Sequence, residues 1–117
     1  MKLNELEKAV FRLFVDSEGF GSIDLEPVEV ANRNMTDVGF MTVLMPNQFR
    51  IEKAPPTFNG GRVGAILNGC TEVGFLIAIK DRFVDFLEGY TYGGEEWPKE
   101  ITSFTLHLVH FSPKEMK

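Results

Sequence analysis

Two apolar segments joined by a two-residue polar turn constrain this chain more than any other feature. Residues 73–79 carry no polar side chain, residues 83–87 are mostly apolar, and Asp81-Arg82 lies between the two segments. Short apolar runs separated by such a turn predict a β-hairpin. Because successive strand side chains point to opposite faces, the first segment needs apolar neighbours on both faces. The hairpin therefore predicts a sheet that the rest of the chain extends or covers.

A helix is predicted at the start of the chain. Residues 2–15 have the period of an amphipathic helix, and Asn4 with Glu7 three residues later has the form of a capping box. Gly19 is expected to end the helix. A helix of about 14 residues is marginal alone in water, so its apolar stripe must lie on the sheet. The stripe consists of Leu3, Leu6, Val10, Leu13 and Phe14.

Four further segments complete the predicted sheet. They are residues 28–34, 38–46, 62–68 and 103–110. Asn68-Gly69 is typical of a hairpin turn and is expected to join the third of these to the central hairpin. The sequence therefore predicts an α+β fold in a single domain, residues 1–117, with one N-terminal amphipathic helix packed on a mainly antiparallel, twisted sheet of about six strands.

Two details of this sheet follow from local sequence. Regular alternation along the second hairpin strand places Val84 and Leu87 on opposite faces. Residues 47–61 are punctuated by proline, asparagine and glycine, and we expect them to form a long loop that Ile51 and Phe58 attach to the core. Loops of this length are often functional.

Composition limits the class of protein. The 117 residues are 44% hydrophobic and 25% charged, as in ordinary globular proteins. No apolar run approaches the length of about 20 residues that a membrane-spanning helix needs. Charged residues occupy the start of the chain, where a signal peptide would be apolar. We therefore expect a cytoplasmic protein that does not bind membranes, and the single cysteine, Cys70, agrees with a reducing compartment.

The net charge of −5 is unevenly distributed. Residues 81–100 contain six acidic and two basic side chains, which gives this segment a charge of −4. A negative field repels the phosphates of nucleic acids and favours a basic protein partner. The alternative interpretation is that these residues are solvated turns that only keep the protein soluble.

No catalytic residue, metal site or cofactor is predicted. Cys70 follows a turn without an electropositive surrounding that would activate its thiol. His107 and His110 are three apart on a predicted strand, so they point to opposite faces and cannot share a metal ion without a bulge. The glycines of residues 59–64 lack the Lys-Ser/Thr ending of a phosphate-binding loop and precede a strand.

The segment after the hairpin combines aromatic and acidic side chains. An extended backbone places Glu88, Tyr90 and Tyr92 on one face, as is typical of protein interfaces. The predicted partner-binding residues are Glu88, Tyr90, Tyr92, Glu95, Glu96 and Trp97. The alternative is that these rings close one end of the core with their polar atoms satisfied.

The motifs of residues 34–42, 72–92 and 96–98 resemble those of a widespread group of small uncharacterised bacterial proteins. In that group a leading helix is followed by a "TGVGFFT"-like strand and an "LEGYTY…WP" segment. The resemblance covers most of the chain but implies no activity and transfers no functional residue. Asp81-Arg82 departs from the group's Asp-Gly, which leaves the turn type open. The closing strand and acidic segment are also loosely similar to immunity proteins of bacterial toxin systems.

Three functional hypotheses follow. The first is a non-enzymatic protein-binding module of the immunity type, whose acidic aromatic face holds a basic partner. The second is a small-molecule-binding protein or enzyme with a pocket between helix and sheet, using Glu88 or His107. The third is a homodimer whose sheets pair or stack to cover the second apolar face of the central strands.

Overall fold

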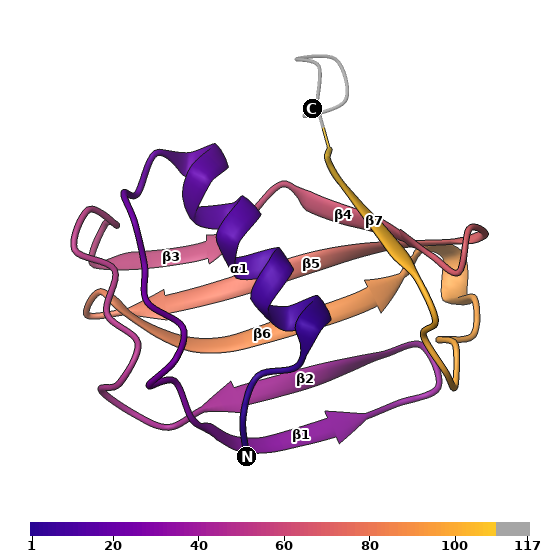
Figure 1. Cartoon of the computed structure of the whole chain (residues 1–117), viewed down its shortest axis with the longest axis horizontal. Helices are drawn as coiled ribbons and strands as arrows, with labels where there is room; N and C mark the ends of the chain where they lie inside the picture. The colour runs from indigo at the N-terminus through magenta and orange to yellow at the C-terminus, as the bar shows by residue number, and fades with distance from the viewer. Residues whose placement is uncertain (110–117) are drawn as a thin grey trace.

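The computed structural model describes residues 1–109, which fold into one helix on one face of a seven-stranded sheet (Figure 1). The elements are α1 (Glu5–Glu18), β1 (Val30–Met35), β2 (Gly39–Leu44), β3 (Thr57–Gly60), β4 (Val63–Leu67), β5 (Thr71–Lys80), β6 (Phe83–Thr91), η1 (Tyr92–Gly94) and β7 (Phe104–Leu108). The strands lie in the order β1-β2-β6-β5-β4-β7, and β3 also pairs with β5. Every strand pair is antiparallel. The predicted α+β class is confirmed, with seven strands instead of about six.

The central hairpin is β5–β6, as predicted. Its turn is closed by the pair Lys80 and Phe83, and Asp81 and Arg82 have φ angles of 54° and 68°. Positive φ at both central residues identifies a type I′ turn, which favours glycine at the position of Arg82. The register then shifts by one residue, so that Ile79 pairs with Val84 but Ala78 pairs with Phe86. This bulge places Val84 and Leu87 on the same buried face, which corrects the predicted regular alternation.

α1 begins and ends at the predicted signals. Asn4 Oδ1 accepts the N–H of Glu7 at 2.8 Å, and Glu7 Oε1 accepts the N–H of Asn4 at 2.9 Å, which confirms the capping box. Gly19 ends the helix with φ 71°. Leu6, Val10 and Phe14 are buried as the stripe predicts, and Phe11 is buried beside them. Within residues 1–109, no helix has the length and apolar character that a membrane crossing requires.

Glu7 also attaches α1 to the sheet. Its carboxylate is fully buried and accepts hydrogen bonds from Arg33 Nε at 2.9 Å and Arg33 Nη2 at 2.6 Å. The hydroxyl of the buried Thr42 donates to the same carboxylate. Arg33 lies on β1 and Thr42 beside it on β2, so one side chain of the helix contacts two strands. This charged network fixes the helix at one end of the sheet.

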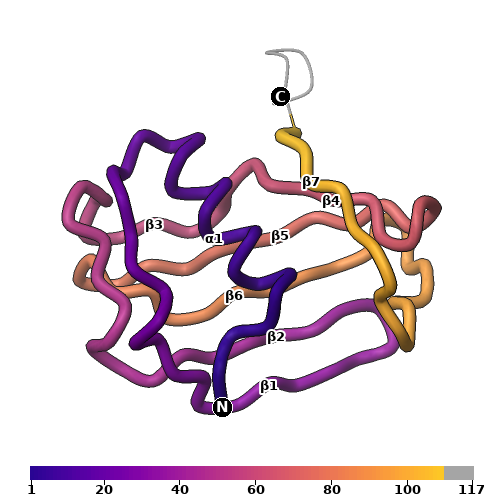
Figure 2. Tube along the Cα trace, viewed as in Figure 1, coloured from indigo at the N-terminus to yellow at the C-terminus, as the bar shows by residue number. Residues whose placement is uncertain are grey.

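Residues 47–61 are more ordered than predicted. Phe49, Ile51 and Ala54 are buried. The backbone of this segment pairs with the start of β6, where Val84 N–H donates to Phe49 C=O at 2.8 Å. β3, which the sequence analysis missed, ends the segment and pairs with the second half of β5. Figure 2 shows the segment at the same end of the molecule as the connection between α1 and β1. The predicted loop is therefore part of the scaffold at this end.

Candidate functional site

The two faces of the sheet differ in cover. α1 packs on one face, where Val73, Phe75, Ile77 and Ile79 of β5 are buried (Figure 1). The intervening residues of β5 point to the opposite face, here called the outer face, which no element of residues 1–109 covers. Its apolar side chains, partly or fully exposed, are Met41, Val43, Ile66, Leu76, Ala78 and Phe86. The outer face therefore offers several apolar side chains that a partner could bury.

A row of small residues and rings crosses the outer face. Its members are consecutive register partners on β2, β6, β5, β4 and β7: Gly39, Tyr90, Gly74, Gly64 and His107. A Cβ atom on Gly74 would lie 2.8 Å from the hydroxyl oxygens of Tyr90 and Tyr92. A Cβ atom on Gly64 would lie 2.7 Å from Nε2 of His107. The rings thus lie directly over glycine backbone, in space that any other residue would fill.

Tyr90 and Tyr92 form a pair of rings on this row. Their centroids are 5.8 Å apart and their planes are 85° apart, and 38% and 40% of the two residues are exposed. Partial burial, with a smaller contribution from Glu88, raises the pKa of Tyr90. Burial raises the pKa of Tyr92 as well, followed by the effects of Tyr90 and Glu72. Each ring therefore lies close enough to a carboxylate to experience its field.

A small pocket of about 210 Å³ adjoins the two rings. It is lined by Gly61, Arg62, Val63, Glu72, Phe75, Tyr90, Tyr92 and Val109. We call the two tyrosines with Glu72, Glu88 and Gly74 the Tyr90–Tyr92 site. Its rings come from β6 and η1, and its floor comes from β5.

The predicted partner-binding residues divide into three groups. Glu88, Tyr90 and Tyr92 are brought together at the outer face. Glu95 and Glu96 are exposed in the loop that follows. Trp97 is 5% exposed and packs edge-on against Phe40 with centroids 5.2 Å apart. Trp97 therefore lies in the core and not on the predicted binding surface.

The burial of Trp97 comes from contacts with β2 and the turn before it. Its backbone N–H donates to Asp37 C=O at 2.7 Å, and Phe40 lies over Gly89 of β6. The exit loop thus folds back along β2, and the indole closes that end of the core, as the alternative interpretation expected.

Sequence reasoning missed two members of the Tyr90–Tyr92 site, which are Glu72 and Gly74. If the strands continued from the turn pair Lys80 and Phe83 without an irregularity, Tyr90 would pair with Val73. The bulge after Val84 shifts the register, and Tyr90 pairs with Gly74 instead. Because nothing in the sequence marks the bulge, no local signal could have found these neighbours.

Charge is separated between the two halves of the described chain. The six ion pairs found among residues 1–109 all join groups within residues 1–62. The seven carboxylates of residues 72–100 take part in none of these pairs. They are Glu72, Asp81, Asp85, Glu88, Glu95, Glu96 and Glu100. Residues 72–100 therefore carry a net charge of −4, seven carboxylates against Lys80, Arg82 and Lys99, with none of these groups in the ion pairs found among residues 1–109.

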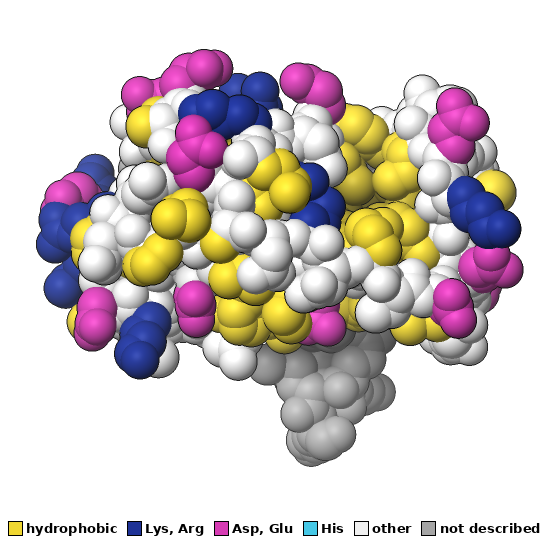
Figure 3. All heavy atoms as spheres, turned by 90° about the horizontal axis from the view of Figure 1, so that it is seen from below, with side chains coloured by type: hydrophobic (Ala, Val, Ile, Leu, Met, Phe, Trp, Pro, Cys, Tyr) yellow, Lys and Arg dark blue, Asp and Glu magenta, His cyan; other side chains and the backbone are white. Residues whose placement is uncertain are grey.

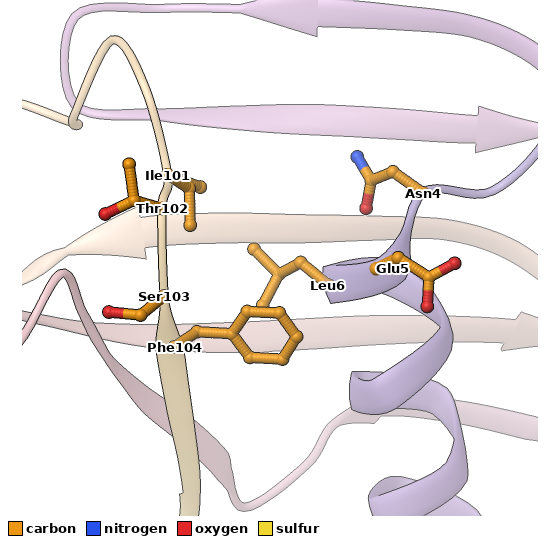
Figure 4. Close-up of a pocket in the computed structure, with 7 residues that line it drawn as sticks. All are labelled: Asn4, Glu5, Leu6, Ile101, Thr102, Ser103 and Phe104. Atoms are coloured by element: carbon orange, nitrogen blue, oxygen red, sulfur yellow. The ribbon is translucent and has the colours of Figure 1, made fainter.

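A second candidate site lies between α1 and β7. It is an open groove of about 560 Å³ lined by Asn4, Glu5, Leu6, Ile101, Thr102, Ser103 and Phe104 (Figure 4). The side chains of Leu6 and Phe104 point toward one another across it (Figure 4). Figure 3, which views the molecule from below in Figure 1, shows hydrophobic side chains in a hollow with charged side chains at both ends.

The groove does not contain the residues expected for catalysis there. Glu88 and His107, which the second hypothesis placed in a pocket between helix and sheet, both point to the outer face. The prediction that they line a pocket between helix and sheet is therefore wrong. Among residues 1–109, Glu5 is the one ionisable side chain that lines the groove. The lining suits an amphipathic small molecule and offers no pair of groups for acid–base chemistry.

Comparisons of the chain with models of protein families, with curated proteins and with solved structures found no match. Among residues 1–109, no group of three or more His, Cys, Asp or Glu side chains is arranged to hold a metal ion. Any functional assignment therefore depends on the geometry and charge of the two sites described above.

Proposed function

We propose that this protein is a non-enzymatic binding module of the immunity type that holds a basic protein partner against its outer face. The observation that carries this proposal is a sheet face that no element of residues 1–109 covers, on which apolar side chains adjoin the carboxylates of Glu72 and Glu88, which form no ion pair within those residues. Apolar atoms removed from water supply affinity, at about 25 cal/mol per Å². The carboxylates supply orientation and a fast encounter with a positively charged surface.

The uncovered face supports a protein partner more than a small ligand. Met41, Leu76 and Phe86 are partly buried on adjacent strands and form a shallow apolar surface. Shallow surfaces with an apolar centre and a polar rim are typical of protein interfaces, whereas small ligands bind in concave pockets. Carboxylates that have no internal cation lose no existing ion pair when a basic partner binds. The net charge of −5 acts in the same direction.

A charge-reversal pair tests the proposal. Glu88→Lys places a positive charge on the outer face, and Glu5→Lys makes the same change at the exposed start of α1, on the opposite side of the sheet. Partners are first isolated from the native cell with the unaltered protein, and the purified partner is then titrated against each variant. We expect Glu88→Lys to weaken binding at least tenfold, Glu5→Lys to leave it within about twofold, and added salt to weaken binding to the unaltered protein.

Two outcomes contradict this function. One is a partner that binds the two variants equally well, because its site then lies away from the outer face. The other is a stable homodimer whose interface covers the outer face, detected by light scattering at low concentration and lost in Glu88→Lys. That result supports the third hypothesis and leaves no free surface for a basic protein.

The groove between α1 and β7 favours a second candidate function, the binding of an amphipathic small molecule. Its volume of about 560 Å³ falls within the range of about 300–1,000 Å³ that is usual for such ligands. Leu6 and Phe104 supply apolar walls, and Thr102 and Ser103 supply polar atoms. A ligand that co-purifies with the protein and is lost in Phe104→Ala, with folding retained, would support this function.

A further inference from the structure

We infer that the Tyr90–Tyr92 site binds one cationic side chain, an arginine or a lysine, of a protein partner. This inference rests on the proposed function and names the anchor by which the basic partner is held. The pocket that adjoins the two rings has a volume of about 210 Å³, which is below the usual range of about 300–1,000 Å³ for small-molecule pockets. This size suits a single side chain entering from a partner surface.

The arrangement of the two rings suits a cation. Aromatic faces carry negative potential and attract an ammonium or guanidinium group within about 6 Å of the ring centroid. Because the planes of Tyr90 and Tyr92 are 85° apart, the rings form two walls of a corner. Glu88 lies near the first ring and Glu72 near the second, so the corner has a carboxylate on each side. A guanidinium seated there could contact a ring face and donate to a carboxylate at the same time.

Glycine at position 74 lets both tyrosines lie against the sheet. Gly74 forms the floor beneath both tyrosine hydroxyls, and Gly64 is its register partner on β4. A Cβ atom on Gly74 would clash with both tyrosine hydroxyls, whereas a Cβ atom on Gly64 would clash with the ring of His107.

The guanidinium of Arg62, a residue that lines the pocket, lies outside this corner. Arg62 contributes to the lining of the pocket, but its guanidinium points to the end of α1. There Nη2 donates to Ser17 C=O at 3.3 Å and Nε lies 3.7 Å from Glu18 Oε2. Glu72 and Glu88 are therefore not neutralised by Arg62. The same negative field contributes to the raised pKa of both tyrosines.

A purely structural role for the rings makes different predictions. Aromatic side chains that lie over glycine can stabilise a sheet by covering its backbone. If this were their whole role, replacing a tyrosine would lower the stability of the protein without any effect on a cationic probe. Replacing Glu72 by glutamine would then have no effect on either property.

The test is an NMR titration of the isotope-labelled full chain with two capped tripeptides, acetyl-Gly-Arg-Gly-amide and acetyl-Gly-Gln-Gly-amide. We expect the arginine peptide to bind with a Kd on the order of millimolar, with shifts centred on Glu72, Gly74 and Tyr90, and the glutamine peptide to give none. Tyr92→Leu and Glu72→Gln should each weaken the arginine peptide about two- to fivefold, the factor expected for one exposed cation–π or ion-pair contact. Asp85→Asn removes the same charge from an exposed position elsewhere on β6 and should change the affinity less than 1.5-fold, well below the effect of one such contact.

Three results would overturn the inference: equal binding of both peptides, shifts that are not centred on the site, or equal effects of Glu72→Gln and Asp85→Asn. The proposed function has its own test in Ala78→Arg. Ala78 lies on the outer face four residues from Gly74 along β5, so this variant obstructs the face away from Glu72 and the two rings. A protein partner lost in Ala78→Arg but retained in Tyr92→Leu and Glu72→Gln would support the function and refute the cationic anchor.

Discussion

The network around Glu7 makes the sharpest prediction about stability. The carboxylate is 0% exposed and accepts two hydrogen bonds from Arg33, one from Thr42 and one from the backbone of Asn4. Glu7→Gln keeps the size of the side chain but removes its charge, so the guanidinium of Arg33 loses its counter-ion. Breaking a buried ion pair from one side usually costs about 3–5 kcal/mol. Because the Arg33 side chain is 20% exposed and can recover some hydration, we expect a loss of about 3 kcal/mol.

Urea denaturation followed by circular dichroism measures this loss. With an m-value of about 1–3 kcal/mol/M for a small protein, the midpoint should fall by about 1–3 M. Thr42→Val removes a single hydrogen bond to the carboxylate and should cost about 1.5–3 kcal/mol. The double variant Glu7→Leu/Arg33→Met replaces both charges by apolar groups and should recover much of the loss. A Glu7→Gln midpoint equal to that of the unaltered protein would refute the role assigned to this network.

Three further predictions concern the turns and the tyrosines. Arg82→Gly should stabilise the protein by about 0.5–1 kcal/mol in a thermal melt, because glycine adopts the positive φ of 68° without strain; no gain would contradict the type I′ turn. Asn68→Ala should cost about 2 kcal/mol and speed hydrogen exchange at the start of β7, because the Asn68 amide donates to Glu100 C=O at 2.8 Å and accepts backbone N–H groups of the same segment. Burial raises the pKa values of Tyr90 and Tyr92 in the folded state. The contribution of these two residues to the free energy of unfolding is therefore complete below the unfolded tyrosine pKa of about 10 and is lost as the pH rises above it. Replacing both by phenylalanine should reduce this alkaline loss in denaturation curves, and an unchanged pH profile would show that neither ring titrates with a raised pKa.

Much of the fold could be predicted from the sequence because its signals are local. The capping box at Asn4, the glycine after α1 and the apolar run of β5 each act within a few residues, and each was found where predicted. β3 has the sequence Thr57-Phe-Asn-Gly60, which follows two prolines and carries turn residues. Its strand geometry comes from pairing with β5, a partner about 20 residues away. Local propensity therefore argued against a strand that tertiary pairing produces.

The candidate site was predictable only in part, for a related reason. Glu88 and Tyr90 are two residues apart, and any extended backbone places them on one face. Trp97 was assigned to the same surface because its neighbours are acidic, although its burial depends on Phe40, more than 50 residues earlier. Contacts across strands decide which aromatic residue lies on the surface and which lies in the core.

The bulge after Val84 determines both which side chains of β6 fill the core and which lie on the outer face. Without a bulge, the type I′ turn pairs Tyr90 with Val73, and the ring then points toward α1, into the core beside Phe75, while Leu87 faces outward. One extra residue in β6 reverses the faces of all positions that follow. Leu87 enters the core, and Glu88 and Tyr90 turn outward, where Gly74 leaves room for the ring. The same irregularity that completes the core thus also assembles the acidic aromatic surface.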